Sequence, residues 1–298
     1  MSYHDPVLLF ESVDGLAVKQ EGVYVDVTFG GGGHSKEILK RLGEKGKLFA
    51  FDQDPDALNN VINDERFVLI PENFRFLKQF LRSKGIKQVD GILADLGVSS
   101  HQFDIPERGF STRFDAELDM RMDTQSDLSA YHVINDYKEE ELSNVLFQYG
   151  ELRSARKMAS EIVKAREEKP IETSFDLKKI LQGFLPKSKE HKILAQIFQA
   201  IRIEVNQEIE VLKEFLLQTS ELIKKEGRLS VISYHSLEDR LVKRFIQNGK
   251  FEGEAEKDFY GNVSVPFKKT GKLIVPRQEE IKKNNRARSA KLRIAERI

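Results

Sequence analysis

The chain contains no cysteine and no tryptophan. Without thiols, disulfide bonds, thiol nucleophiles and cysteine-type zinc sites are excluded, and nothing requires an oxidising compartment. The six histidines are scattered, with no pair at metal-ligand spacing. We therefore expect no bound metal.

Long hydrophobic runs are also missing. A membrane-spanning helix needs about 20 consecutive apolar residues, and no such run exists here. The opening stretch MSYHDPVLLFESVDG carries acidic residues and lacks the basic segment typical of a signal peptide. We therefore expect a cytoplasmic protein without a membrane segment.

Net charge is absent as well, because 48 basic residues balance 48 acidic ones. The charge is unevenly distributed, however. The stretch 282–298, KKNNRARSAKLRIAERI, holds seven basic residues and one acidic residue. Such a run is either a solvated face or a surface for a polyanion such as RNA.

Apolar, β-branched runs alternate with helical patterns over the first 95 residues. Strands are predicted at 22–28, 46–52, 66–70 and 89–97, with helical segments between them. A βαβαβαβ order is typical of an α/β fold, with a parallel sheet covered by helices on both faces. Ligands of such sheets bind beyond the carboxyl ends of the strands, at the switch point.

The pattern changes after residue 105. Helical segments without a strand predict an inserted helical domain at 106–205, so the sheet domain comprises 1–105 and 206–298. The apolar spacing in 191–227 predicts one long helix.

The sheet resumes with a fifth strand in GRLSVISYHS, followed by a helix. We expect a loop at 249–272. Closing antiparallel strands are expected at 271–276 and 289–298.

Four consecutive glycines, Gly30 to Gly33 in DVTFGGGGHS, follow the first predicted strand. A phosphate-binding P-loop is excluded, since the required lysine and hydroxyl are misplaced. A dinucleotide fingerprint is partly satisfied: Gly30 and Gly32 fit, Ser35 replaces the third glycine, and Asp52 follows as a ribose-binding acid should.

S-adenosylmethionine (AdoMet) fits the same βαβ unit with a different charge pattern. Asp26, just before the glycines, suits a cationic ligand and would repel a pyrophosphate. Asp52 would accept the ribose hydroxyls, and Phe74 would pack on the adenine. The alternative is that both carboxylates cap loops and Phe74 belongs to the core. We favour AdoMet over NAD.

The fourth predicted strand ends in DGILADLGVSS, which puts Asp95 across the switch point from the glycines. A transferred group would meet its acceptor there. The alternative is an aspartate that only satisfies a turn.

Several longer motifs occur in order along nearly the whole chain: TFGGGGHS, DGILADLGVSS, LDMRMD, FQAIRIEVNQEIEVL, VISYHSLEDR and NNRARSAKLRIAE. Together they resemble the bacterial ribosomal RNA small-subunit methyltransferase H family, also called MraW. The resemblance implies a Rossmann-like AdoMet-dependent methyltransferase sheet with an inserted helical domain for substrate recognition. It further implies methylation of the N4 amine of a cytidine in the decoding region of 16S rRNA, with the small ribosomal subunit as partner.

The resemblance also assigns cofactor contacts. They fall on Gly32, Gly33, His34, Asp52, Phe74, Asp95 and Gln102. Asp95 is the candidate catalytic residue. The chain departs from the family by His101 in place of proline and Phe103 in place of leucine. These changes leave the cofactor residues intact.

Two charged groups are candidates for the RNA. Asp119, Arg121 and Asp123 of LDMRMD would line the entry to the site, or else form an internal ion-pair cluster. The tail residues expected to contact RNA phosphates are Arg286, Arg288, Lys291 and Arg293.

Other functions remain open at this level. An NAD-dependent oxidoreductase agrees with Gly30, Gly32 and Asp52, although no catalytic His or Tyr is evident. A serine hydrolase lacks the G-x-S-x-G motif. A non-catalytic RNA-binding assembly factor could keep AdoMet only for stability.

Overall fold

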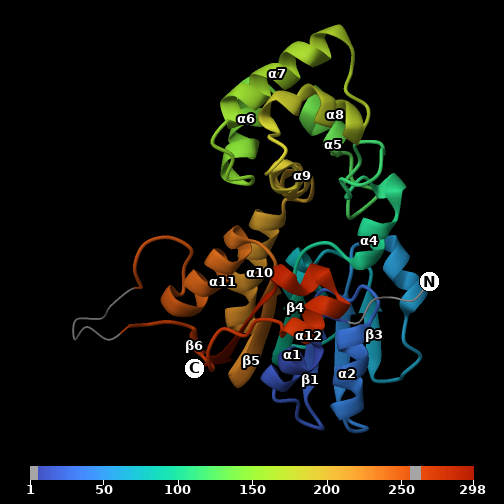
Figure 1. Ribbon diagram of the computed structural model, residues 1–298. Coiled ribbons are helices and arrows are strands. Elements are labelled where there is room, and N and C mark those ends of the chain that lie inside the picture. Colours follow the sequence, from blue (N-terminus) through green and yellow to red (C-terminus); the bar gives the residue numbers. More distant parts are fainter. Residues whose placement is uncertain (1–5, 256–262) are drawn as a thin grey trace. The chain divides into compact units, whose positions relative to one another are not determined.

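The computed structural model describes residues 6–255 and 263–298, and within them seven strands form one sheet (Figure 1). The strands are β1 (Val23–Asp26), β2 (Lys47–Phe51), β3 (Phe67–Ile70), β4 (Val89–Asp95), β5 (Ile223–Ser233), β6 (Phe267–Lys269) and β7 (Lys291–Arg297). The five strands predicted up to residue 236 are confirmed, because buried parallel strands read as continuous apolar runs.

The order across the sheet is β3-β2-β1-β4-β5-β7-β6. Strands β1 to β5 pair in parallel, whereas β7 is antiparallel to both β5 and β6. From β1 the chain builds outward through β2 to β3 and then returns to β4 on the other side. The switch point therefore lies at the carboxyl ends of β1 and β4, where α/β sheets bind ligands.

Helices cover both faces of this sheet. They are α1 (Leu9–Gly15), α2 (Gly33–Arg41), α3 (Leu77–Ser83), α10 (Glu208–Leu222), α11 (Ser236–Asn248) and α12 (Gln278–Lys283). Alternate strand residues face opposite sides: Tyr24 packs with Leu16 and Ile38 of the α1–α2 side. Its neighbour Val25 belongs to the cluster that includes residues of α3, α10 and α11, such as Phe215.

The chain divides into two units: the described residues of Met1–Gly97 with Ile209–Ile298, and Val98–Glu208. The second, helical unit contains α4 (Ser100–Asp104), α5 (Ala130–Asn135), α6 (Glu139–Gln148), α7 (Ala155–Glu168), α8 (Ser174–Ile180) and α9 (Glu190–Asn206). They surround one apolar core, in which Leu142, Ile162 and Ile197 are fully buried. Across the described residues, every helix falls short of the length and apolarity that a bilayer crossing requires.

The long helix predicted at 191–227 is wrong, because the structure divides it. Gln207 adopts a left-handed backbone with φ 50° and separates α9 from α10. Asn206 is held by the Met120 carbonyl and the Met122 amide, and Arg202 bonds Glu208 across the break at 2.7 Å. These tertiary contacts bend the chain without glycine or proline.

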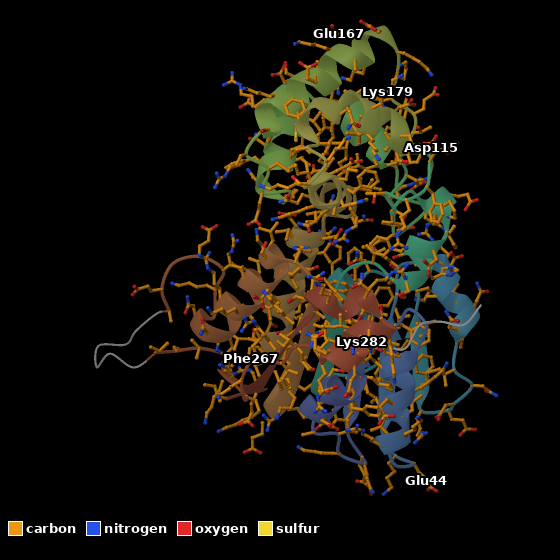
Figure 2. The ribbon with its side chains drawn as sticks, viewed as in Figure 1. Glu44, Asp115, Glu167, Lys179, Phe267 and Lys282 are labelled. Atoms are coloured by element: carbon orange, nitrogen blue, oxygen red, sulfur yellow. The ribbon has the colours of Figure 1, made fainter. Side chains whose placement is uncertain are left out.

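The C-terminal region also differs from prediction. The antiparallel strand predicted at 289–298 is confirmed as β7, but the segment 271–276 contributes only an isolated bridge between Ile274 and Leu292. The other closing strand is β6, inside the predicted loop 249–272, of which 256–262 lie outside the described residues. Phe267 of β6, labelled in Figure 2, is buried in the core, whereas Lys268 and Lys269 are exposed.

Candidate active site

The glycine run forms a tight turn between β1 and α2. Gly30 and Gly32 have φ of +50° and +74°, which side-chain-bearing residues rarely adopt. The Gly32 amide donates to the Phe29 carbonyl at 2.7 Å. A Cβ at Gly33 would lie 2.0 Å from Pro6, whereas one at Gly30 would meet nothing within 4 Å. The loop therefore presents bare backbone to open space at Gly30.

Asp52 follows β2 and fastens this loop. Its Oδ2 accepts from the Gly30 amide at 2.7 Å, and its Oδ1 accepts from the Asp54 amide at 2.9 Å. Burial raises the pKa of Asp52 to about 6, against the lowering effect of both amides. The carboxylate is thus ionised at pH 7, beside the open backbone, with lone pairs left to accept ligand hydroxyls.

Asp95 ends β4 on the other side of β1. Its amide donates to Thr28 Oγ1 at 2.6 Å, and its Oδ1 accepts from the Tyr234 hydroxyl at 2.8 Å. Burial raises the pKa of Asp95 to about 6, and the hydrogen bond from Tyr234 opposes this rise. Tyr234 was missed by sequence reasoning, although the motif VISYHSLEDR contains it, because it lies 139 residues from Asp95.

His34 lies in the first turn of α2 and is buried. Its Nε2 is 3.2 Å from the Val7 carbonyl, and its Nδ1 is 4.0 Å from Asp95 Oδ2. Burial lowers the pKa of His34 below its ordinary value, so the ring is neutral at pH 7. A neutral ring that donates from Nε2 keeps Nδ1 as an acceptor on the Asp95 side.

Asp26 ends β1, and its side chain is fully buried, so any influence on a cationic ligand is through its charge and not through direct contact. It accepts instead from Ser35 Oγ at 2.7 Å and from the Thr28 amide at 3.2 Å. Burial raises the pKa of Asp26 to about 6, against these bonds. Asp26 braces the glycine loop from behind.

Phe74 follows β3 in the short helix η2 (Phe74–Phe76). Its ring meets Phe215 edge to face, with centroids 5.3 Å apart. The ring is half-buried and packs on the core cluster beneath the sheet. The remaining ring surface is available for a flat ligand group.

Gln102 belongs to the helical unit, where it is buried in α4. The side-chain Oε1 of Gln102 accepts from the backbone amide of Ser99 at 3.0 Å, and the backbone amide of Gln102 donates to Ser99 Oγ at 3.2 Å. This capping box fixes the start of α4. His101 and Phe103, the two departures from the family pattern, flank it in the same helix.

The LDMRMD stretch, also in the helical unit, contains an ion pair. Arg121 Nη2 lies 2.7 Å from Asp119 Oδ2, and Arg121 Nη1 donates to the Ser126 carbonyl at 2.8 Å. Asp123 Oδ1 accepts from the Gln125 amide at 2.9 Å. The internal-cluster interpretation of this stretch accounts for these bonds.

The basic tail is divided between internal and external positions. Arg293 Nε donates to Asp239 Oδ1 at 2.7 Å, and Lys291 Nζ is 3.4 Å from Asp239 Oδ2. Arg288 is exposed in η5 (Asn285–Ser289), and Arg286 is half-buried there. Lys282 adds an exposed cation on α12, as labelled in Figure 2.

The carboxyl ends of the strands around the glycine loop are therefore negatively charged. Asp52 and Asp95 flank an open glycine backbone, with Asp26 behind it, so a cationic ligand is stabilised there and a pyrophosphate is repelled. A parallel sheet with one reversed strand, a glycine loop after β1 and carboxylates after β2 and β4 defines an AdoMet-dependent methyltransferase with a Rossmann-like fold.

Comparison with known proteins gives the family. The chain matches the MraW methylase family over residues 1–298 and belongs to it. It is 70% identical to ribosomal RNA small subunit methyltransferase H of Flavobacterium johnsoniae, over 100% of this chain and 99% of that protein. The protein of the same name in Christiangramia forsetii is 68% identical over 100% of this chain and 99% of its own length. The one in Cytophaga hutchinsonii is 58% identical over 99% of this chain and 99% of its own length. The resemblance seen in the sequence is confirmed, and the NAD-dependent oxidoreductase is wrong.

Proposed function

We propose that this methyltransferase transfers the methyl group of AdoMet to the N4 amine of a cytidine in the decoding region of 16S rRNA. The observation that carries the proposal is Asp95, which stands at the carboxyl end of β4 and bonds Thr28 and Tyr234. Relatives named ribosomal RNA small subunit methyltransferase H support an rRNA of the small subunit as substrate. An rRNA substrate in turn supports the expected cytoplasmic location.

AdoMet, when bound, supplies an electrophilic methyl group on a sulfonium. Within the sheet unit, the glycine loop would approach it with backbone that is open at Gly30, Gly32 and Gly33 are the contacts expected from the family, and Asp52 would accept its ribose hydroxyls. Phe74 would cover the adenine with its half-buried ring. His34 Nδ1 and Asp95 would face the cationic end, and Gln102 is the expected contact from the helical unit.

The acceptor amine is a weak nucleophile, because its lone pair is delocalised into the cytosine ring. Asp95 would accept a hydrogen bond from this amine, which localises the lone pair and disperses the positive charge that develops during transfer. A carboxyl group with a pKa of about 6 is ionised at pH 7 and therefore serves as an acceptor. The carbonyls of Leu96 and Gly97 are further acceptors next in the chain. In-line positioning supplies the rest of the catalysis.

The helical unit and the basic tail would recognise the substrate. A base that leaves its stack costs a few kcal/mol, which phosphate contacts offset. In the tail, Arg288 is exposed and Arg286 is half-buried, and both are proposed phosphate contacts, whereas Lys291 and Arg293 also pair with Asp239. Asp119, Arg121 and Asp123 remain proposed entry residues in the helical unit.

The test uses labelled AdoMet and 30S subunits from cells that lack this activity. After incubation with the protein, the RNA is digested to nucleosides and the labelled one is identified. Label on the N4 amine of one cytidine, lost in Asp95→Asn even at saturating AdoMet, is the expected result.

AdoMet binding without transfer, on 30S subunits and on naked 16S RNA, would overturn the substrate. The non-catalytic assembly factor would then be the better interpretation. Full turnover by Asp95→Asn would overturn only the role of Asp95.

A further inference from the structure

A second basic site lies in the sheet unit, away from the glycine loop. A shallow surface pocket, open to solvent and with a cavity volume of about 10 Å³, is bordered by α11, by the turn after β6 and by β7. Its lining residues are Lys243, Ile246, Gln247, Lys269, Thr270, Lys272, Leu273, Arg293 and Ile294. Four of these nine are cations and none is acidic, although the whole chain is neutral.

The cations come from three segments that are distant in sequence. Lys243 is exposed on α11, and Lys269 and Lys272 are exposed on either side of a turn at Gly271. Gly271 has φ +73°, and a Cβ there would meet nothing within 4 Å, so this turn projects freely. Arg293 is the fixed member, because its Nε is bonded to Asp239 at 2.7 Å. The fold, and not a run of sequence, assembles the group.

The sheet register sets the distance from the proposed reaction site. Asp95 pairs with Ile232 of β5, which pairs with Leu292 of β7, the residue before Arg293. Two strand spacings, about 10 Å, separate β4 from β7, and Lys269 lies one strand further, on β6, where it pairs with Ala295. The pocket thus lies about 10–15 Å across the sheet from Asp95, a distance that a neighbouring stretch of RNA backbone spans.

We propose that this pocket binds a backbone phosphate of the RNA substrate, beside the target cytidine. The proposal rests on the proposed function and extends it to Lys243, Lys269 and Lys272. Three flexible ammonium groups around one fixed guanidinium suit a phosphate, which accepts from several donors at once. Contacts of this kind set the register of a nucleic acid without reading its sequence.

The experiment compares Lys269→Gln/Lys272→Gln with a matched control, Lys84→Gln/Lys87→Gln. The control lysines are also exposed, but they precede the amino end of β4. Binding to undermethylated 30S subunits is measured from 50 to 200 mM salt, together with AdoMet affinity and methyl transfer. The pocket variant should reduce the slope of log K against log salt by about 0.7–0.9, since the pocket holds one phosphate and each phosphate contact contributes about that much. It should raise KM for 30S subunits several-fold and leave kcat and AdoMet affinity unchanged.

Lys243→Gln tests the same phosphate from α11, and its slope should fall by no more than that of the double variant. A slope equal to that of the control variant, in an enzyme that methylates normally, would overturn the pocket and leave the proposed function standing. A wild-type protein that transfers no methyl group to 30S subunits would overturn the function itself. The two failures are therefore distinguishable.

Discussion

The hydrogen bond from Tyr234 to Asp95 makes the acid side of the pH profile a direct test of the site. Tyr234→Phe removes a 2.8 Å donor from a partly buried carboxylate. Hydrogen bonds to charged groups contribute about 1.5–3 kcal/mol, and one pKa unit corresponds to about 1.4 kcal/mol. The pKa of Asp95, already raised to about 6 by burial, should therefore rise by roughly one to two further units in the variant.

The direction of the pH effect follows because the ionised form of Asp95 is the active one. Activity rises as the pH passes through the pKa of Asp95, so the variant should lose about two- to tenfold in kcat at pH 7 and recover near pH 9. The assay is methyl transfer from labelled AdoMet to 30S subunits between pH 5 and pH 9.5. Tyr24→Phe is the matched control, because Tyr24 is a buried tyrosine whose hydroxyl accepts from the Lys19 amide instead. An acid limb at the wild-type position, or a loss that is equal at every pH, would refute the reasoning.

Three further predictions concern cofactor binding and stability. Asp52→Ala should raise the Kd for AdoMet about tenfold or more, since a charged acceptor is lost; calorimetry measures it, and an unchanged Kd would contradict the assignment. Ser35→Ala should lower the free energy of unfolding by about 1–3 kcal/mol, because buried Asp26 loses its 2.7 Å bond. The pKa of Asp26 in the folded protein is about 6, above its ordinary value, so the stability contributed by its protonated form is lost as pH rises through 6. Above pH 6 the carboxylate is ionised and its bond to Ser35 is strongest. Urea melts should thus show a larger loss of stability in Ser35→Ala at pH 8 than at pH 5, and equal losses would argue against an ionised Asp26. Arg121→Gln should cost about 1 kcal/mol of stability, the value of a half-exposed pair; a raised KM for 30S subunits with unchanged melting would instead favour the entry role.

The sheet could be predicted from the sequence because its strands are apolar on both faces. Phe49 and Ala50 lie on opposite faces of β2 and are both buried, so the run that contains them has one interpretation. The edge strand β6 could not be found in this way. It buries Phe267 but exposes Lys268 and Lys269, and three such residues are indistinguishable from a loop.

The residue types of the site could be predicted from the sequence, but their hydrogen-bond partners could not. Asp26, Asp52 and Asp95 all lie near the carboxyl ends of predicted strands, yet only the structure shows that Asp26 faces inward to Ser35. The bend at Gln207 depends on Asn206 reaching the backbone of Met120, a contact 86 residues away. Neither propensity nor periodicity carries such information, because both describe neighbours along the chain.

The insertion of the helical unit between two paired strands of the chain has a consequence for folding kinetics. Strand β5 pairs with β4, but residues 98–208 intervene. If that segment of about 110 residues were unfolded, its loop-closure entropy would oppose the pairing by about 2–3 kcal/mol more than a short connection does. Val98 and Val205, near its two ends, pack on the same core, so folding of this segment shortens the loop before the sheet closes. We expect pulse-labelled hydrogen exchange to protect α6 and α9 earlier than β5, which makes the insertion a folding partner of the sheet that it interrupts.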